Sequence, residues 1–505
     1  MKKEEIFNKL AEICGEDDVS IDEADLIATG DWIARGLEAL YKNVSFNAGF
    51  LVTPKNKDEI VQIVKYANAN KIPIIPRAAN TSFGGQVLPV KENTILMDFG
   101  KHMNKILEIN LKEEYVVVEP GVEFWYLQEV LAKDGYFFPA EPGSAFSCMI
   151  GGMVGNNASG ASSFRFGTTR DYVRGLEVVL ANGNIIHTGH KRNEKSVAGY
   201  DLTSLFVGSE GTLGIFTEIY LKIQKLPKNE VSLIVAFMSI DDAYKAIEVI
   251  RDLDIDLALL EYVDPITIEG MNANLKIKLK QGILKKKIRV PKRDGTLLIR
   301  LIGSQYKEDL QKVQELMNNA EIFGENLPKL LILEESINQK YLWDARHYAG
   351  PGIARTMDPP TVPRMMIPAV LDVAVPPSKI VEFLKKAKAI SQEYSIIPIT
   401  MGHIFDGNVH LIAAQNVNVE NIAKIKEYQE KILDVVYSLG GSITAEHGVG
   451  FWKQQFLERE FGKETIETMK KIKQTLDPNN ILNPDKMGVG EIHPIVNFEG
   501  LGETR

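Results

Sequence analysis

The feature of this sequence that most constrains its fold is a stretch crowded with glycines, residues 141–160. Five glycines fall within these twenty positions among small polar side chains, with no Lys and, after position 141, no Glu. Such a segment buries little apolar surface, so packing alone does not explain it. Glycine lets a ligand approach main-chain N–H groups closely, and successive N–H groups in turns bind anions. The stretch therefore indicates either a phosphate cradle or a run of tight turns.

Two further loops of small residues lie before and after this stretch. Residues 76–86 follow the apolar run 72–75, and residues 207–215 read Val-Gly-Ser-Glu-Gly-Thr-Leu-Gly-Ile. Three such loops, each beside a β-rich apolar run, suit one extended ligand that carries a pyrophosphate. None of them reads G-x-G-x-x-G at the head of a helix, so the nicotinamide fingerprint is missing. The ligand therefore needs another explanation.

Two more motifs carry a family resemblance. Residues 165–180 read Arg-Phe-Gly-Thr-Thr-Arg-Asp-Tyr-Val-Arg-Gly-Leu-Glu-Val-Val-Leu, and residues 197–202 read Val-Ala-Gly-Tyr-Asp-Leu. With these motifs and the three loops, the chain resembles the FAD-linked oxidases of the glycolate oxidase and D-lactate dehydrogenase type. That family has the flavin-binding fold of vanillyl-alcohol oxidase and p-cresol methylhydroxylase. The resemblance covers roughly residues 45 to 225 and resumes at the C-terminus.

The resemblance implies an α+β fold. Its parts are a two-part FAD-binding domain, an inserted α+β substrate (cap) domain and a C-terminal helical return. We expect an N-terminal helical segment, the FAD-binding domain, the cap domain, a C-terminal segment that packs back on the FAD-binding domain, and a tail, with bounds 1–45, 46–225, 226–440, 441–490 and 491–505. The alternation of strand and helix patterns supports this fold class.

The resemblance also implies that the three loops bind FAD. No His or Cys lies in the first loop, so a non-covalent link is expected. The family usually has Pro-Arg-Gly-x-Gly-Thr-Ser there, whereas this chain has Ala78 and Asn80 in place of the two glycines. Asn tolerates the left-handed conformation, which Ala disfavours. The expected cofactor-binding residues are Pro76, Arg77, Ala78, Asn80, Thr81, Ser82, Gly84, Gln86, Pro142, Gly143, Ser144, Ile150, Gly151, Gly152, Asn156, Gly160, Gly167, Glu210, Gly211, Gly214 and Ile215.

Composition and charge exclude several classes of function. With 505 residues, the chain is too long for one ordinary core and suggests two or three domains. A formal charge of −9 argues against nucleic acid as the main partner. Cys14 and Cys148 are too few for a disulfide framework or an iron–sulfur cluster, which fits a reducing compartment. The charged N-terminus and the lack of an eighteen-residue apolar run indicate the cytoplasm, with peripheral attachment to a membrane left open.

The spacing of apolar residues predicts individual elements along the chain. Residues 1–45 carry helix-like spacing, including Ile6, Leu10 and Ile13. Helices are expected at 58–67, 241–252 and 380–394, and strands at 50–52, 115–121, 259–263, 297–302 and 371–375. Residues 276–293 stand out because they carry nine Lys or Arg and no acid. This basic stretch is either a solvated loop or edge, or a docking patch for an acidic electron-transfer protein or anionic lipid.

The motif with the clearest chemistry is Met-Gly-His-Ile-Phe-Asp-Gly-Asn-Val-His at residues 401–410. On one continuous strand, its two histidines, seven positions apart, would point to opposite faces. Asp406-Gly407 is, however, the preferred central pair of a two-residue hairpin turn. A hairpin folded there pairs His403 with His410, and directly opposed residues share a face with Cβ atoms about 4.5–5.5 Å apart. The two imidazoles can then chelate one metal ion.

A third metal ligand is offered by Thr-Ala-Glu-His-Gly-Val-Gly at residues 444–450. Two His and one carboxylate with open positions form a recurring catalytic arrangement for zinc or iron. The alternative is a set of histidines that are satisfied within the core, but three of the eight histidines fall in these two short motifs. The sequence favours a divalent metal, with zinc, iron or manganese as candidates.

In metal-dependent FAD-linked 2-hydroxy acid dehydrogenases, the corresponding Gly-His…Gly-Asp-Gly-Asn-x-His and Glu-His-Gly motifs bind metal and carry the base. Phe405 stands where the family usually has Gly, which favours a narrow pocket and a small substrate. The resemblance implies His403, His410 and Glu446 as metal ligands, Asn408 as a polar contact to substrate or flavin, and His447 as the catalytic acid/base.

The expected reaction is oxidation of a small 2-hydroxy acid, D-lactate first and glycolate second, to the 2-oxo acid. Metal binding lowers the pKa of the hydroxyl, His447 takes the proton, and the C2 hydride moves to the flavin. An arginine should hold the carboxylate by a bidentate contact. Arg346 matches the family's position, and Arg364 and Arg355 are further candidates; a surface ion pair is the alternative for all three. Val370 stands where some relatives for larger substrates have Lys, which argues mildly against a dicarboxylate.

The electrons must then pass to an external acceptor, because iron–sulfur ligands, a haem motif and a nicotinamide fingerprint are all missing from the sequence. An electron-transfer flavoprotein, a quinone or a partner iron–sulfur subunit would each serve. Two other functions stay open. One is a flavin-binding subunit of a multi-subunit glycolate oxidase-like complex, and the other is a non-redox FAD transferase of the same fold. Relatives of the latter kind lack the Glu-His pair, so Glu446 argues against it.

Overall fold

The computed structural model of the chain describes residues 2–31, 46–193, 195–284, 287–356, 370–413 and 419–492. It divides into two compact units. Unit 1 contains Met1–Ser159, Gly167–Leu226 and Glu446–Arg505, and unit 2 contains Gly160–Phe166 and Pro227–Ala445. The chain thus changes units after Leu226 and Ala445, where the sequence suggested boundaries after 225 and 440. The short segment Gly160–Phe166, expected within the FAD-binding domain, belongs to unit 2.

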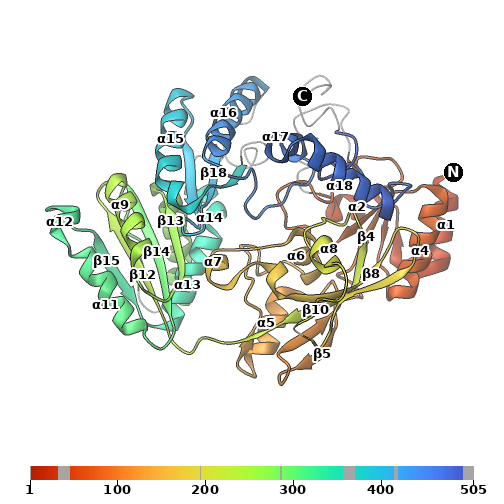
Figure 1. Cartoon of the computed structure of the whole chain (residues 1–505), viewed down its shortest axis with the longest axis horizontal. Helices are drawn as coiled ribbons and strands as arrows, with labels where there is room; N and C mark the ends of the chain where they lie inside the picture. Colours follow the sequence, from red (N-terminus) through yellow and green to blue (C-terminus); the bar gives the residue numbers. More distant parts are fainter. Residues whose placement is uncertain are drawn as a thin grey trace. The chain divides into compact units, whose positions relative to one another are not determined.

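The first sheet of unit 1 has the strand order β1-β2-β4-β3 within the described residues. Its elements are β1 Val19–Ser20, β2 Phe50–Val52, β3 Ile74–Arg77 and β4 Ile95–Asp98, with helices α1 Lys3–Cys14, α2 Glu23–Thr29 and α4 Lys57–Asn70 (Figure 1). Strands β2 and β3 both run parallel to β4. Parallel strands that are buried on both faces need continuous apolar runs, and all four residues of β4 are buried.

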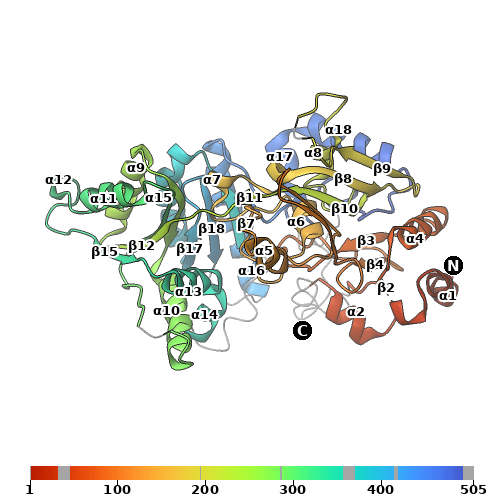
Figure 2. The ribbon, with the colours of Figure 1, turned by 90° about the horizontal axis from the view of Figure 1, so that it is seen from below.

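Helices α1 and α4 lie side by side in both views (Figures 1 and 2). Asn56 caps α4 by accepting the N–H groups of Asp58 and Glu59. The apolar residues of α4 at helical spacing are all fully buried, namely Ile60, Ile63, Val64 and Ala67. This burial confirms the helix predicted at 58–67, and α1 confirms that the spacing of Ile6, Leu10 and Ile13 is helical.

The second sheet of unit 1 is antiparallel, with the strand order β5-β6-β10-β8-β9 in the part of the chain that the structure describes. Its elements are β5 Ile106–Asn110, β6 Tyr115–Val118, α5 Phe124–Ala132, α6 Ile150–Asn156, η2 Thr169–Tyr172, β8 Val173–Val179, β9 Ile185–Gly189, α8 Leu202–Phe206 and β10 Ile215–Lys222; β7 Tyr136–Phe137 pairs with β11 Gln224–Lys225 beside it. Val116 and Val118 of β6 join Leu127 of α5 and Met153 of α6 in one apolar core.

The C-terminal part of unit 1 packs on these two sheets. It contains η4 Gln454–Phe456, α17 Leu457–Phe461 and α18 Lys463–Leu476, and Leu482 forms a parallel bridge with Ile74 of β3. Lys473 of α18 is buried, and its ammonium donates to the carbonyls of Thr212 and Leu482 at 2.8 and 2.7 Å. The hydrogen bond to Thr212 and the bridge to Ile74 therefore anchor the C-terminal return to residues far away in the sequence.

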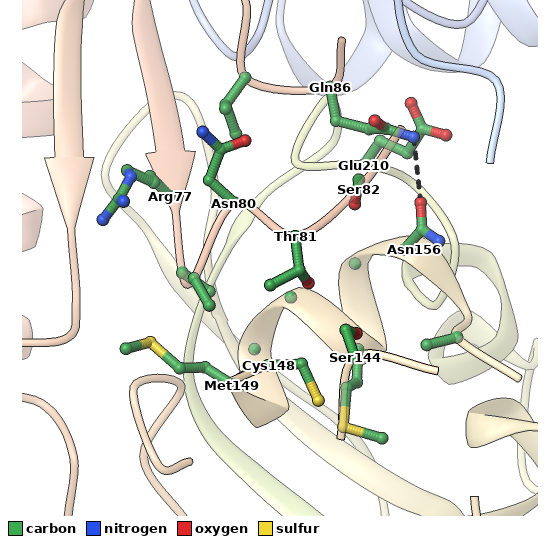
Figure 3. Close-up of a pocket in the computed structure, with 18 of the residues that line it drawn as sticks. Arg77, Asn80, Thr81, Ser82, Gln86, Ser144, Cys148, Met149, Asn156 and Glu210 are labelled. Carbon is green, nitrogen blue, oxygen red and sulfur yellow. Dashed lines mark hydrogen bonds between the residues drawn. The ribbon is translucent and has the colours of Figure 1, made fainter. Parts of the chain in front are cut away.

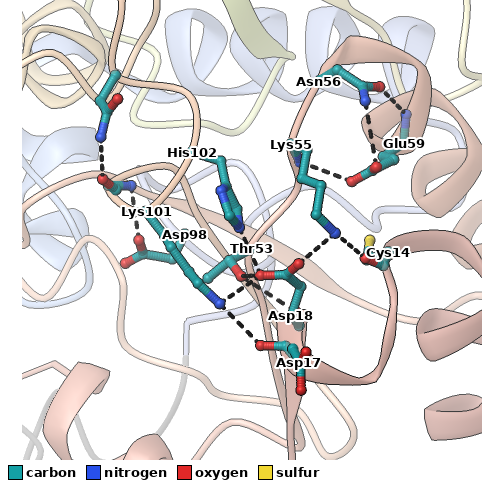
Figure 4. A network of polar contacts seen from close by, with 12 residues as sticks. Cys14, Asp17, Asp18, Thr53, Lys55, Asn56, Glu59, Asp98, Lys101 and His102 are labelled. Atoms are coloured by element: carbon teal, nitrogen blue, oxygen red, sulfur yellow. Dashed lines mark hydrogen bonds and ion pairs between the residues drawn. The ribbon is translucent and has the colours of Figure 1, made fainter.

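The N-terminal segment is held to unit 1 through Asp18 (Figure 4). Its carboxylate accepts hydrogen bonds from Lys101 at 2.6 Å and Thr53 at 2.9 Å, contacts His102 at 2.7 Å, and pairs with Lys55. Burial alone would raise the pKa of Asp18, but these hydrogen bonds outweigh it and hold the pKa well below its ordinary value. The carboxylate therefore joins the N-terminus to two loops of unit 1.

Unit 2 is built on a sheet with the order β15-β12-β14-β13-β17-β18-β16 among the described residues. Its elements are α7 Ser163–Phe166, β12 Glu230–Phe237, α9 Ile240–Asp252, β13 Leu257–Val263, α10 Pro265–Lys280, β14 Gly295–Ile302, α11 Tyr306–Met317, α12 Ala320–Phe323, β15 Lys329–Leu333, α13 Ser336–His347, α14 Ala349–Thr356, β16 Val370–Ala374, η3 Pro377–Lys379, α15 Ile380–Glu393, β17 Pro398–Gly402, β18 Asn408–Ala413 and α16 Val419–Ser438. The helices α9 and α15 and the strands β13, β14 and β16 confirm the elements predicted for this region.

Helices cover both faces of this sheet. Leu259 and Val263 of β13 pack in one core with Met271 of α10 and Trp343 of α13. On the opposite face, the Tyr262 ring lies against Tyr244 of α9. Side chains along β13 alternate between the two helical layers, so an odd-numbered polar residue on this strand faces α10 and α13.

Within the described residues, no helix is both long and apolar enough to cross a membrane. The basic stretch begins in the last turns of α10, where Lys276 and Lys280 are exposed, and it continues through exposed Lys287 and Arg289. Lys292 pairs with Glu269. A docking role for this stretch stays a prediction.

Candidate functional site: a glycine-lined cavity and a two-histidine strand pair

The three small-residue loops of unit 1 meet around one cavity of about 1200 Å³, a volume that includes the solvent at its mouth (Figure 3). The first loop leaves the C-terminal end of β3, the second leads into α6, and the third leads into β10. The cavity wall of glycines, small hydroxyl side chains and exposed backbone fits the pyrophosphate part of FAD.

Most of the residues predicted to bind the cofactor lie in this wall. They are Pro76, Arg77, Ala78, Asn80, Thr81, Ser82, Gln86, Pro142, Gly143, Ser144, Gly151, Gly152, Asn156, Glu210, Gly211 and Gly214. Gly84, Ile150, Gly167 and Ile215 belong to unit 1 but do not line the cavity, and Gly160 belongs to unit 2.

These exceptions have physical reasons. Ile150 and Ile215 are fully buried in the two apolar cores of unit 1. The carbonyl of Gly84 accepts the N–H of Phe451 at 2.7 Å, so it serves the C-terminal return. Gly167 has a φ of +84° and forms a turn in which a Cβ would lie 2.5 Å from Asp171 Oδ2. Sequence adjacency to a motif did not distinguish these core and turn positions from the cavity wall.

The first loop accommodates both of its departures from the family pattern. Asn80 has a φ of +54°, the left-handed conformation that Asn tolerates and that the family usually supplies with Gly. Ala78 is not among the residues with positive φ, so its Cβ adds no backbone strain. Arg77, at the start of the loop, pairs with Asp98 at the end of β4. The loop therefore keeps its shape without the two glycines.

Several wall residues had no signal in the sequence beyond their proximity to the loops. They are Ala79, Phe83, Val87, Phe99, Pro120, Cys148, Met149, Met153, Gly155, Ala158, Ser159 and Phe216. Phe83 is the most informative, because its ring lies 4.8 Å from the His447 imidazole, centroid to centroid. Glu446 and His447 themselves line the cavity, with Glu446 Oε1 and His447 Nε2 3.9 Å apart. A carboxylate and an imidazole thus stand at the wall of the predicted flavin site.

The two-histidine motif of unit 2 differs from the predicted two-residue hairpin. Met401 pairs with His410, and β17 ends at Gly402, so His403 begins a turn that runs to Gly407. The predicted direct pairing of His403 with His410 is therefore wrong by two positions. Gly407 has a φ of +93°, and its carbonyl accepts the N–H of Val375, the residue directly after β16, at 3.0 Å.

The shared face survives this correction, because a shift of two residues preserves the alternation of side chains. His403 and His410 become diagonal neighbours, and their rings lie 5.4 Å apart at 89°. Both histidines are buried, with 8% of each exposed. The pairing of His410 with Asp372 on β16 brings an acid to the same face.

Each imidazole faces a buried carboxylate that the sequence analysis missed. Nδ1 of His403 lies 2.5 Å from Glu261 Oε1, and Nδ1 of His410 lies 3.3 Å from Asp372 Oδ1. Metal-binding histidines commonly present one ring nitrogen to a carboxylate, which fixes the ring and directs the other nitrogen to the ion. The donor set of this face therefore fits a divalent metal. A buried acid in an apolar strand, as in Leu-Leu-Glu-Tyr-Val, was the available signal.

Arg346 of α13 makes a bidentate ion pair with Glu261. Its Nε and Nη2 donate to the two carboxylate oxygens at 2.7 and 2.9 Å, and both side chains are buried. Burial would raise the pKa of Glu261, but Arg346 and His403 outweigh it and lower the pKa to about 2. Arg346, expected to bind substrate carboxylate, thus uses two nitrogens on Glu261. Arg364 and the side chain of Arg355 lie outside the described residues.

Asn408 is likewise held by its own unit. Its Nδ2 donates to Asp372 Oδ1 at 2.7 Å, and 4% of the residue is exposed. Asp372 Oδ2 accepts the Thr444 hydroxyl at 3.2 Å and the Ala445 N–H at 3.1 Å. Asp372 therefore fixes the chain immediately before the peptide bond to Glu446.

Comparison with known proteins agrees with this geometry. Residues 226–487 match the family model described as "FAD linked oxidases, C-terminal domain", and residues 48–189 match the model described as "FAD binding domain". The chain is 35% identical over 438 residues to the glycolate oxidase subunit GlcD of Bacillus subtilis, covering 86% of this chain and 88% of that protein. It is 34% identical over 447 residues to the mitochondrial D-lactate dehydrogenase [cytochrome] of Arabidopsis thaliana, covering 86% of this chain and 73% of that protein.

Solved structures show the same fold at low sequence identity. The substrate-bound crystal structure of p-cresol methylhydroxylase has a TM-score of 0.74 at 18% identity, covering 96% of this chain and 97% of that chain. An alkyldihydroxyacetonephosphate synthase has a TM-score of 0.73 at 19% identity, covering 96% of this chain and 86% of that chain. These structures confirm the α+β flavin-binding fold inferred from the sequence.

Proposed function

The chain belongs to the FAD-linked oxidases, a family of FAD-dependent oxidoreductases, and from this premise we propose that it oxidises a small 2-hydroxy acid to the 2-oxo acid. D-lactate is the first candidate and glycolate the second, in keeping with the names of the most similar relatives. The observation that carries the proposal is that Glu446 and His447 line the same cavity as the three cofactor loops. No part of a phosphate cradle needs such a pair, whereas removal of a hydroxyl proton next to a flavin does.

In the proposal, His447 is the acid/base that takes the proton of the substrate hydroxyl. Its imidazole packs beside the Phe83 ring, with the ring centroids 4.8 Å apart. FAD, when bound, supplies the acceptor for the C2 hydride. The partial burial of the His447 side chain, 18% exposed, keeps the base within the cavity wall.

His403, His410 and Glu446 are the proposed ligands of a divalent metal. The support for this proposal is the pair of carboxylates that face the two imidazoles, Glu261 and Asp372. A bound zinc, iron or manganese ion would supply a Lewis acid that lowers the pKa of the substrate hydroxyl. Glu446 follows directly on Ala445, whose N–H is bound by Asp372.

Arg346 stays the candidate for the substrate carboxylate, through Nη1, the guanidinium nitrogen that does not bind Glu261. Asn408 is proposed to orient Asp372 and to present its amide to the substrate. Electrons then pass to an external acceptor, such as an electron-transfer flavoprotein, a quinone or an iron–sulfur subunit. We propose a cytoplasmic location, with peripheral attachment to a membrane as the alternative.

A panel of 2-hydroxy acids tests the proposal. The FAD-loaded protein is titrated anaerobically with D-lactate, L-lactate, glycolate and D-malate while the flavin absorbance is followed. Bleaching by D-lactate or glycolate is expected, whereas an oxidised flavin in the presence of every acid would refute the proposal.

The second candidate function is a flavin-binding subunit of a glycolate oxidase-like complex, favoured by the similarity to a glycolate oxidase subunit. It predicts that glycolate bleaches the flavin of the isolated chain, but that catalytic turnover occurs only when partner subunits are added. A non-redox FAD transferase would bleach with none of the acids.

A further inference from the structure

The backbone of the Glu446–His447 pair is held by side chains from two of the cofactor loops. Gln86 Nε2, from the first loop, donates to the carbonyl of His447 at 2.8 Å. Asn156 Nδ2, at the end of α6, donates to the carbonyl of Glu446 at 2.9 Å. The same Gln86 nitrogen lies 3.2 Å from Asn156 Oδ1, so the two amides also support each other (Figure 3).

The third cofactor loop holds Val449 and Gly450, which follow in the same segment. The carboxylate of Glu210 accepts the N–H of Val449 at 2.7 Å through Oε1 and the N–H of Gly450 at 2.8 Å through Oε2. All four hydrogen bonds therefore fall within the five-residue segment 446–450, and each cofactor loop contributes one side chain. We refer to Gln86, Asn156 and Glu210 as the loop clamp.

The loop clamp closes around Gly448. A Cβ at Gly448 would lie 2.3 Å from Asn156 Oδ1, 2.6 Å from Glu210 Oε1 and 2.7 Å from Gln86 Nε2. Three polar side chains from three separate loops thus converge on Gly448, which has no side chain. Only glycine fits there, at a φ of +75°.

Glu210 is an unusual residue for a purely structural contact. It is 8% exposed and has a φ of +50°, a conformation that a long side chain rarely adopts. Burial raises the pKa of Glu210 to about 7, against the lowering effect of its hydrogen bonds with Val449, Gly450 and Gln86. Strained and buried polar residues of this kind concentrate at functional sites.

We propose that Gln86, Asn156 and Glu210 are positioning residues, whose side chains fix Glu446 and His447 in the cavity wall instead of binding FAD themselves. The proposal rests on the function proposed above and adds to it the residues that place the base and the metal-ligating carboxylate. It reassigns three residues that the family resemblance gave to the cofactor. Their polar atoms form hydrogen bonds with the backbone of residues 446–450. The glycines and hydroxyl side chains of the same wall remain to bind the cofactor.

Glu210→Gln and Asn156→Ala test the proposal in the FAD- and metal-loaded full-length protein. Glu177→Gln and Gln128→Ala are the matched controls, because Glu177 is a buried acid of unit 1 bound by Lys57, and Gln128 holds the backbone of Phe138 through two hydrogen bonds. Neither control residue lines the cavity. Each variant is measured for FAD content, for the limiting rate of anaerobic flavin reduction and for the hydroxy acid concentration that gives half that rate.

The loop-clamp variants should keep wild-type FAD content and the same half-saturating concentration, while the limiting rate falls on the order of 10- to 100-fold, as misplacement of a catalytic group by about 1 Å produces. The controls should keep the wild-type rate. Loss of FAD with the rate restored by excess FAD would overturn the proposal, because the side chains would then bind the cofactor. An unchanged rate would also overturn it.

Hydrogen exchange separates this proposal from the proposed function. The amides of Val449 and Gly450 should exchange slowly in the wild type and at least tenfold faster in Glu210→Gln, whether or not any hydroxy acid reduces the flavin. If no acid reduces the wild type, the proposed reaction fails, and equal exchange in both proteins would then refute the loop clamp as well.

Discussion

His403 and Glu261 form one buried pair, with Nδ1 and Oε1 2.5 Å apart. These residues are far apart in sequence, and the register of β13 with β17 brings them together. Tyr262 pairs with Gly402, so Glu261, one position before Tyr262, comes to lie beside His403, one position after Gly402. The carboxylate fixes one nitrogen of the ring and so decides where the other one points. If the metal proposal is correct, Glu261 and Asp372 determine how tightly the ion is held.

Asp372→Asn should therefore weaken the metal site. Loss of a carboxylate that orients a metal-binding histidine typically lowers metal affinity about 10- to 100-fold. The metal content of the purified protein and its resistance to a graded chelator series measure this directly, and FAD content should stay unchanged. Asp309→Asn is the matched control, because Asp309 is a buried acid of unit 2 that binds the Asp256 N–H. Equal metal retention in both variants would contradict the assignment.

Removal of Arg346 should destabilise unit 2. Arg346→Met leaves the buried Glu261 carboxylate without its bidentate partner, and breaking a buried pair in this way costs about 3–5 kcal/mol. Urea unfolding measures the loss in free energy of unfolding, and the double variant Arg346→Met/Glu261→Leu should recover most of it. A loss below about 1 kcal/mol for the single variant would mean that the pair is not what holds this face together.

Asp18 should make the attachment of the N-terminal segment sensitive to acid. Its folded-state pKa lies below the ordinary value of 3.8, so the stabilisation is fully present above that value and is lost as the pH falls through the lower folded-state pKa. Asp18→Asn should lower the free energy of unfolding by about 2 kcal/mol at pH 7. The difference from wild type should shrink as the pH falls below 3.8. An equal difference at pH 7 and pH 3, measured by urea unfolding, would rule out this charge effect.

Substitutions at the adjacent glycines Gly151 and Gly152 should have different effects. A Cβ at Gly151 would lie 2.6 Å from Pro120 Cβ and 2.8 Å from its carbonyl oxygen, so Gly151→Ala should lower the free energy of unfolding by about 1–3 kcal/mol. A Cβ at Gly152 meets only Ala78 Cβ, at 3.2 Å, in the cavity wall. Gly152→Leu should therefore fold but bind FAD weakly. Flavin absorbance and thermal unfolding distinguish the two, and full FAD content in Gly152→Leu would contradict the cofactor site.

The sequence predicted the fold well wherever local pattern decides structure. Apolar spacing located α4 and α9, and the glycine-rich loops carried enough of the family pattern to identify the cofactor fold. The length of the turn after His403 was predicted wrongly. Asp406-Gly407 is a strong signal for a two-residue turn between two paired strands, whereas the turn between β17 and β18 is longer. The N–H of Val375, directly after the third strand β16, donates to the carbonyl of Gly407, a contact that lies outside the hairpin pattern. The two histidines still lie on one face, because a shift of two residues preserves the alternation of side chains along a strand.

The contacts of Glu261, Asp372 and the loop clamp could not be predicted from local sequence pattern, for another reason. Glu261 meets His403 only through the order of strands in the sheet, and Glu210 meets Val449 only through the return of the C-terminal segment to unit 1. A single sequence contains no local signal for such pairs. A buried acid in an apolar segment of the sequence is a sign of such a pair. It indicates that the acid has a partner, but it does not identify the partner residue.

A single-turnover measurement shows whether oxidation of the hydroxy acid is coupled to reduction of the flavin and requires the metal. The FAD- and metal-loaded protein is mixed anaerobically with D-lactate or glycolate, and the flavin absorbance and the 2-oxo acid are quantified together, with and without prior removal of metal by a chelator. We expect one 2-oxo acid per reduced flavin in the loaded protein, and an oxidised flavin that is still bound after chelation. A flavin that stays oxidised in the loaded protein, or one that is reduced equally well after the metal is removed, would contradict the proposed function.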